Sequence, residues 1–173
     1  RVEIGAGATL DHVKVLAAGE AAIHSSLWQV ELAAEARYRA FHFSAGTGLA
    51  RNEVWLTYAG ENASADISGV TLARGKEHID TTLVVDHAVP RGMSRELFKF
   101  VLDDEARGVF QGKVIVRPHA QKSDGKQMAQ ALMLAPTAEF DSKPELEIYA
   151  DDVICGHGST AAELDRDLVF YCR

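Results

Sequence analysis

Short runs of β-prone residues recur along most of the chain, separated by Gly, Asn, Asp and Ser. Residues 38–43 and 53–58 mix apolar and polar positions in alternation and carry aromatic side chains, which is typical of half-buried strands. Eight further runs are predicted to be strands: residues 27–32, 65–72, 78–85, 96–102, 109–116, 130–134, 146–149 and 153–155. Such a succession of short strands with few helical stretches predicts an all-β protein.

The connections between these runs are typical of a β-solenoid. Asp124-Gly125 is the one dipeptide suited to a two-residue hairpin turn, and it lies inside a longer polar stretch at residues 121–126. The other turns contain single glycines: Gly60, Gly69, Gly75, Gly92, Gly108 and Gly112. Strands with small-residue corners suit stacked coils, but no repeat of fixed length is present. The pattern is therefore compatible with both a solenoid and a β-sandwich.

Residues 160–173 are the best candidate for a helix. Thr160 can act as the N-cap, with Glu163 three residues later as in a capping box, and leucines follow at helical spacing. Residues 93–104 also show a short helical stripe, but their aromatic and β-branched residues favour a strand. We therefore expect a β core at residues 1–159 and the start of a helical segment at residues 160–173.

Composition narrows the class of protein. The chain has 173 residues, 47% of them apolar and 25% charged, which predicts one globular domain. A net charge of −7 without a basic cluster argues against a nucleic-acid partner. No apolar run approaches the roughly 20 residues that span a bilayer, and no signal peptide is recognisable. Two cysteines form no disulfide framework, so a reducing, cytoplasmic location is predicted. Because no starting Met is present, we expect a fragment or a processed chain.

The sharpest candidate for chemistry is the Cys155-Gly156-His157 motif. In an extended segment, Cys155 and His157 point to the same face, and thiolate and imidazole together suit iron or zinc. The pair would equally suit a cysteine nucleophile activated by histidine, or a buried Cys before a glycine-rich turn. Asp151 and Asp152 could orient the histidine. Two ligands cannot complete a tetrahedral site, so the spacing points to a site at an interface.

The remaining candidates favour ordinary structural roles. Three histidines lack a local partner and are predicted to be surface or core residues: His12, His24 and His42. His78 and His87 end one predicted strand on opposite faces, so they cannot share a metal ion without a bend. Glu145 and Glu147 share a strand face, where a solvated surface is favoured over a catalytic carboxylate pair. Cys172 is predicted to be a buried structural thiol. No nucleotide-binding or hydrolase motif is found.

One long segment identifies a family. Residues 146–160, Leu-Glu-Ile-Tyr-Ala-Asp-Asp-Val-Ile-Cys-Gly-His-Gly-Ser-Thr, closely resemble the signature of the SufB/SufD family of iron–sulfur cluster assembly proteins. Further stretches support the resemblance: residues 108–114, 120–125, 130–134 and 170–173. The match is densest over residues 107–173 and continues, more weakly, from residue 1. The region around Cys155 and the absence of further cysteine ligands are more similar to SufD members than to SufB members.

The resemblance implies a right-handed parallel β-helix and a scaffold role rather than an enzyme activity. It implies a subunit of the SufBCD complex that pairs with SufB through the β-helix edge, with SufC as the ATPase. Cys155 and His157 would then lie at the SufB–SufD interface, where the nascent cluster forms. The resemblance thus implies that an iron–sulfur cluster or iron is held transiently, only in the complex, and not tightly by this chain alone.

Two departures and two alternatives accompany the resemblance. The family's N-terminal helical region and the C-terminal helices that hold SufC are missing, so SufC binding by this chain alone is in question. The open end of a β-helix presents unpaired strand edges, so a homodimer is an alternative to pairing with SufB. The other readings are a β-helix enzyme acting on acidic polysaccharide, for which Glu145, Glu147, Asp151 and Asp152 would supply acids, and a purely structural partner without a metal role.

Overall fold

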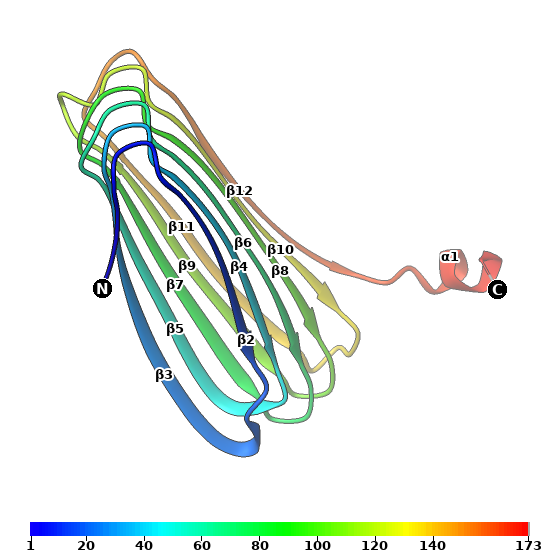
Figure 1. The fold of residues 1–173 in the computed structure, drawn as a ribbon. Coiled ribbons are helices and arrows are strands. Elements are labelled where there is room, and N and C mark those ends of the chain that lie inside the picture. The colour runs from blue at the N-terminus through cyan, green and yellow to red at the C-terminus, as the bar shows by residue number, and fades with distance from the viewer. Residues whose placement is uncertain (173) are drawn as a thin grey trace.

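The computed structural model describes residues 1–172, in which twelve strands wind into a flattened solenoid with one sheet on each side (Figure 1). Odd-numbered strands form the first sheet and even-numbered strands form the second, and every pairing is parallel. The strands are β1 (Val2–Ile4), β2 (Thr9–Leu16), β3 (Gly19–Leu32), β4 (Arg37–Ala45), β5 (Thr47–Tyr58), β6 (Ser64–Ala73), β7 (His78–His87), β8 (Met93–Leu102), β9 (Arg107–Val116), β10 (Asp124–Met133), β11 (Glu139–Ile148) and β12 (Ile154–Glu163). The predicted all-β solenoid is confirmed, and the sandwich is not found.

Each coil contains one strand of each sheet and two turns, and the coils differ in length. Thr9 pairs with Arg37, 28 residues later, whereas Met93 pairs with Asp124, 31 residues later. Apart from a register shift between Gly19 and Ile23 of β3, the pairing stays in register inside the strands, so most of the difference in coil length lies in the turns. This variation explains why no repeat of fixed length is visible in the sequence.

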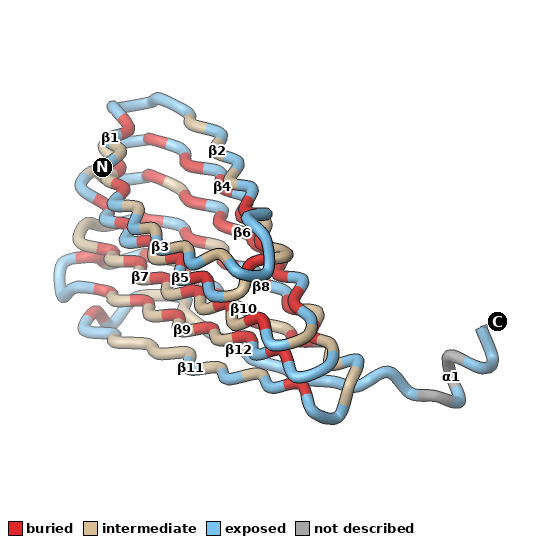
Figure 2. The backbone as a smooth tube through the Cα atoms, turned by 90° about the horizontal axis from the view of Figure 1, so that it is seen from below, coloured by how far each residue is buried: buried red, intermediate tan, exposed pale blue. Residues whose placement is uncertain are grey.

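The core lies between the two sheets, where buried residues alternate with exposed ones along each strand (Figure 2). Its centre is a group of aromatic rings that we call the aromatic plug: Phe98, Phe100, Phe110 and Phe140. The Phe98 and Phe110 rings are 5.1 Å apart, and those of Phe100 and Phe140 are 5.0 Å apart. Gly69 makes room for this plug, because a Cβ atom there would lie 2.6 Å from the Phe98 ring.

The C-terminal helix does not begin where the sequence predicts. Thr160 and Glu163, expected to form a capping box, instead lie in β12, because pairing with β10 continues to Glu163. The helix α1 spans Arg166–Tyr171 and lies away from the solenoid (Figure 1). Cys172 beside it is exposed, so the prediction of a buried thiol is wrong. Arg173, the end of the predicted segment, lies outside the described residues, and the division at residue 160 stays a prediction.

Two other regions refine the strand predictions. Residues 93–102 form β8, as the aromatic content favoured. The strands β1 and β2 were not predicted, and β11 begins at Glu139, seven residues before the predicted run. Within residues 1–172, the structure contains no helix of the length and apolar character needed to cross a bilayer.

Candidate functional site at the C-terminal edge

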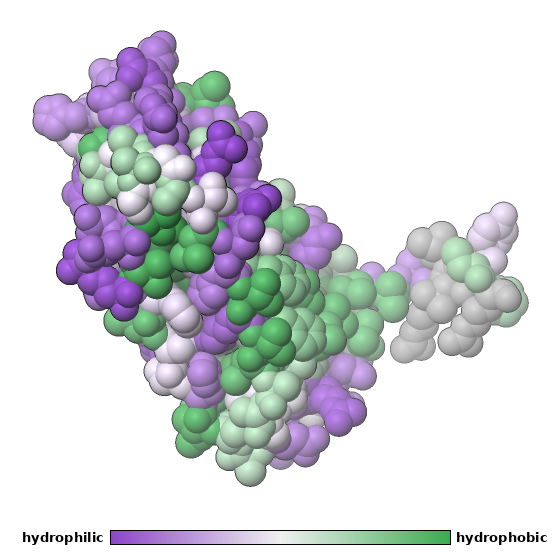
Figure 3. Space-filling model, viewed as in Figure 1, coloured by the Kyte–Doolittle hydropathy of each residue, from purple (hydrophilic) through white to green (hydrophobic). Residues whose placement is uncertain are grey.

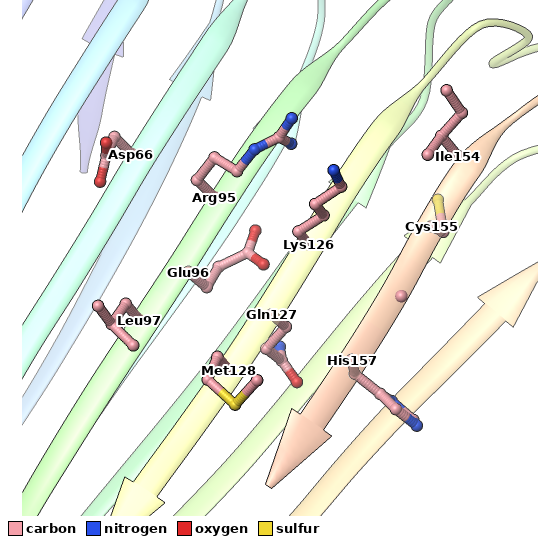
Figure 4. A pocket seen from close by; sticks show the side chains of 11 residues that line it. Asp66, Arg95, Glu96, Leu97, Lys126, Gln127, Met128, Ile154, Cys155 and His157 are labelled. Carbon is pink, nitrogen blue, oxygen red and sulfur yellow. The ribbon is translucent and has the colours of Figure 1, made fainter.

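Cys155 and His157 lie on β12, the last strand of the second sheet. Among the described residues, β12 pairs with β10 alone, so its other edge carries free backbone donors and acceptors. Cys155 pairs with Gly125 and His157 pairs with Gln127, both of which are buried residues of β10. The two side chains therefore share the inward face of β12 (Figure 4), where Cys155 is half-buried and His157 is exposed. The predicted same-face arrangement is confirmed.

The surroundings of Cys155 keep its thiol protonated. Burial raises the pKa of Cys155, a hydrogen bond with the backbone of Gly125 opposes that rise, and the charges of Asp124 and Glu96 add to it. A thiol with a raised pKa is a poor nucleophile at neutral pH, which disfavours the activated-cysteine alternative. Iron would have to displace the thiol proton in order to bind.

Two buried polar side chains, which the sequence pattern did not identify, lie next to His157 on the neighbouring strands and lead from it into the interior of the solenoid. Gln127 on β10 pairs in register with His157 on one side and with Glu96 of β8 on the other, and Glu96 and Gln127 are each 3% exposed. We call Glu96, Gln127 and His157 the polar row. Neighbouring strands lie about 4.8 Å apart, so the row leads from the interior to the edge in steps of about that size.

The inner part of the polar row lacks hydrogen-bond partners. Among the described residues, no partner within hydrogen-bond distance is found for either oxygen of Glu96 or for the amide atoms of Gln127. The Gln127 amide lies over Gly112 of the opposite sheet, where a Cβ atom would come within 2.4 Å of it. Burial raises the pKa of Glu96 to about 7, Ser94 and Arg95 oppose the rise, and Asp66 adds to it. Unpaired buried polar groups destabilise a fold, which points to a role other than packing.

The same three strands carry an apolar groove of about 590 Å³ beside this site (Figure 4). Leu97, Met128 and Ile154 line it, and Arg95 and Lys126 flank it. Ile154 is 65% exposed and Leu97 is 39% exposed. The space-filling view shows apolar side chains gathered over the lower half of the visible face (Figure 3). The candidate ligands therefore lie next to an apolar surface.

The other candidate groups have partners that account for them. Asp152, which was expected to orient His157, forms an ion pair with Lys122. Glu145 pairs with Lys143 at 3.0 Å and Glu147 with Lys113 at 2.5 Å, as expected of a solvated strand face. The part of the chain that the structure describes holds no group of three His, Cys, Asp or Glu residues arranged to hold a metal ion.

The ends of β7 carry its two histidines on opposite faces, as predicted. His87 is fully buried, stacks on Tyr58 at 4.3 Å and shares a hydrogen bond with Ser94 at 3.1 Å, whereas His78 is half-buried. Burial lowers the pKa of His87 to about 4, so its ring is neutral. Gly92 permits this packing, because a Cβ atom there would lie 2.6 Å from Nδ1 of His87.

Comparison with known proteins decides the family. The family described as SUF system FeS cluster assembly, SufBD core domain, matches residues 1–173. The chain belongs to the SufBD family. This SufBD chain is 33% identical over 172 residues to the iron–sulfur cluster assembly protein SufD of Escherichia coli, and the match covers 99% of the chain and 41% of that relative.

Two further relatives extend the similarity of the SufBD chain across bacteria and plants. It is 31% identical over 174 residues to a SufBD family protein of Synechocystis, covering 99% of the chain and 38% of the relative. It is 31% identical over 173 residues to the chloroplastic protein ABCI7 of Arabidopsis thaliana, covering 98% and 36%. The chain thus spans about two fifths of the length of these relatives.

Proposed function

We propose that this chain is the β-solenoid core of a scaffold subunit for iron–sulfur cluster assembly, and that Cys155 and His157 are ligands for iron or a nascent cluster. The observation that carries the proposal is their common inward face on the edge strand β12. Thiolate and imidazole are both iron ligands, and cluster sulfide would add further bonds. Iron and cluster are cargo in this proposal, held only while the complex is assembled.

The incomplete ligand set supports an interface site. Cys155 and His157 supply two ligands, and a partner strand added at the free edge of β12 would bring its own side chains beside them. We propose a SufB-type subunit as this partner and a SufC-type ATPase as a further member of the complex, in the cytoplasm. A second copy of the chain at the same edge is the alternative arrangement. The chain itself would catalyse no reaction.

The decisive experiment compares His157→Ala with wild type in the full-length protein, co-expressed anaerobically with SufB and SufC. We expect the complex to remain intact while bound iron and sulfide fall at least fivefold, because one ligand is lost at the interface. Iron and sulfide are measured on the purified complexes. His119→Ala is the matched control, because His119 is an exposed histidine in the turn between β9 and β10 and does not lie on β12.

Each result has a defined meaning. Equal iron loading in wild type and His157→Ala would overturn the ligand role of His157, and a parallel Cys155→Ser measurement would test the thiolate separately. Loss of the complex itself in His157→Ala would show that the residue acts in pairing instead. Cys172→Ser, at the exposed second cysteine, controls for general effects of removing a thiol.

A further inference from the structure

The opposite end of the solenoid holds a second cluster of polar side chains between the sheets. We call this set the N-terminal mouth: His12, Lys14, His24, Ser26, Trp28, His42 and Asn52. Lys14 of β2 pairs in register with His42 of β4, and Ser26 of β3 pairs with Asn52 of β5. These positions alternate with exposed outward residues such as Val13 and Leu27, so their side chains turn toward the interior.

The charge at the N-terminal mouth is a lysine without a carboxylate. Its ammonium donates hydrogen bonds to Ser26 Oγ and to Asn52 Oδ1, the latter at 2.6 Å, which leaves one of its three donors for another acceptor. No ion pair of Lys14 is found among the described residues. Burial lowers the pKa of Lys14 to about 8. A half-buried cation without an anion is unfavourable unless something supplies the negative charge.

Histidine rings surround this charge and have unused nitrogens. His42 is 5% exposed, and neither ring nitrogen has a partner among the described residues; Nε2 of His24 also lacks one. His12 contacts Tyr38 through a 2.8 Å hydrogen bond, and its ring lies 5.7 Å from that of His42. These rings can each present an N–H group to a ligand between the sheets.

The sign of the charge decides which ligand suits the site. Burial, together with the charges of Lys14 and His12, lowers the pKa of His42 to about 4. Burial and then the charge of Lys14 also lower the pKa values of His12 and His24. A metal ion would meet the same repulsion from Lys14, and the described residues contain no group of three ligands close enough to hold one. An anion would instead be attracted by Lys14 and accept hydrogen bonds from it and from the imidazoles.

The mouth is bounded on the inside by apolar side chains and lies in the first coils of the described solenoid. Behind His42, the next inward residues of the second sheet are Gly69 and Phe98, whose ring fills the space over the glycine. On the outer side, β1 pairs only with Val30–Leu32 of β3, and β2 pairs with β4 alone among the described strands. Packed sheets lie about 10 Å apart, so the space between them admits only a small ligand.

We propose that the N-terminal mouth binds one small inorganic anion, held by Lys14 with hydrogen bonds from the rings of His12 and His42. Hydrosulfide, sulfate and phosphate share the required chemistry of a compact, charged hydrogen-bond acceptor. The proposal is independent of the iron site at β12, because Ala40, Ile67, Glu96 and Gln127 lie between His12 and His157 along the paired strands.

The test is calorimetric titration of the full-length protein with each of the three anions, under anaerobic conditions for hydrosulfide. We expect one anion to bind with 1:1 stoichiometry, and Lys14→Met, which keeps the apolar stem of the side chain, to weaken binding at least tenfold. Lys99→Met is the matched control, since Lys99 is an exposed outward lysine of β8. The anion that binds most tightly is identified as the ligand of the N-terminal mouth.

Two outcomes would overturn the proposal: no binding of any of the three anions, or equal binding by wild type and Lys14→Met. Should Lys14→Met fail to fold, the ring-nitrogen resonances of His12 and His42 in the wild type decide. They are expected to shift on addition of the anion, and unchanged resonances at saturating anion would reject the site. Iron loading is not read in this experiment, so its result is distinct from that for His157→Ala.

Discussion

The two ends of the solenoid interior carry polar groups of opposite character. The N-terminal mouth holds a lysine and three histidines, whereas the C-terminal end holds Glu96, Gln127 and the Cys155–His157 pair. Both ends are built from the same alternation of inward and outward residues. The comparison teaches that a solenoid can keep chemically different sites in one continuous interior, provided that apolar residues separate them.

The largest effect is expected from opening a cavity in the aromatic plug. Phe110 is fully buried and contacts Phe98 in the aromatic plug, so Phe110→Ala should destabilise the fold by about 3–5 kcal/mol through the cavity it leaves. Chemical denaturation measures this loss. Phe170→Ala, at a ring that is 83% exposed, should change the unfolding free energy by less than about 0.5 kcal/mol. Similar losses in the two variants would mean that the plug is not the structural centre.

The next largest effect concerns the buried acid of the C-terminal end. The pKa of Glu96 is about 7 in the folded state against 4.5 when unperturbed, so the folded state binds the proton more tightly. Stability from this group is therefore lost as pH rises from about 4.5 to about 7. Glu96→Gln should be more stable than wild type by on the order of 3 kcal/mol at pH 8, and nearly equal to it at pH 4.

Denaturation curves at pH 4, 6 and 8 measure this difference between Glu96→Gln and wild type. The exposed Glu163 offers a control, and Glu163→Gln should follow the wild type at each pH. A constant difference between Glu96→Gln and wild type over this range would show that Glu96 titrates as an ordinary carboxyl and would contradict its burial as an unpaired acid.

The N-terminal mouth should give the opposite pH dependence, with a slightly smaller effect. The pKa of His42 is about 4 against 6.5 when unperturbed, so the unfolded state binds the proton more tightly, and stability is lost as pH falls from about 6.5 to about 4. His42→Gln should remove on the order of 3 kcal/mol of that loss at pH 4. Part of the loss remains, because the pKa of His87 is lowered in the same way.

Thermal or chemical unfolding between pH 4 and pH 7 measures this loss in His42→Gln, with the exposed His119→Gln as control. Together with Glu96→Gln, it would separate two slopes of opposite sign that overlap in the wild type. If both variants changed the stability on the same side of the pH profile, acid or alkaline, the proposed contrast between the two ends would be wrong.

The sequence predicts the central coils well and the terminal coils poorly. In the central strands, apolar residues face inward, as in β7, and alternation identifies them. In β2 the pattern is inverted, because His12 and Lys14 face inward while Val13 and Val15 are 68% exposed. In β11, Pro144 and its charged neighbours interrupt the apolar alternation by which a strand is predicted. The strand lies at the edge of the first sheet, where proline is tolerated.

Only the part of the candidate site that is formed by residues close together in the sequence could be predicted. Alternation alone places Cys155 and His157 on one face. Glu96 and Gln127 join them through pairings that span 31 and 30 residues, so no local pattern brings them together. The capping-box signature at Thr160 failed for a related reason: ladder hydrogen bonds with β10 outweigh a local helix signal.

Because all strands within each sheet run parallel, the solenoid has a polarity, and this polarity limits how copies or homologues can join. Two subunits that meet at their β12 edges around a two-fold axis pair with reversed strand directions and bury both free edges, so growth stops at two. Stacking of one subunit's last coil on another's first would continue without end. In the closed arrangement, the two N-terminal mouths lie on opposite sides of the joint, each roughly 25 Å from it at about 4.8 Å per coil.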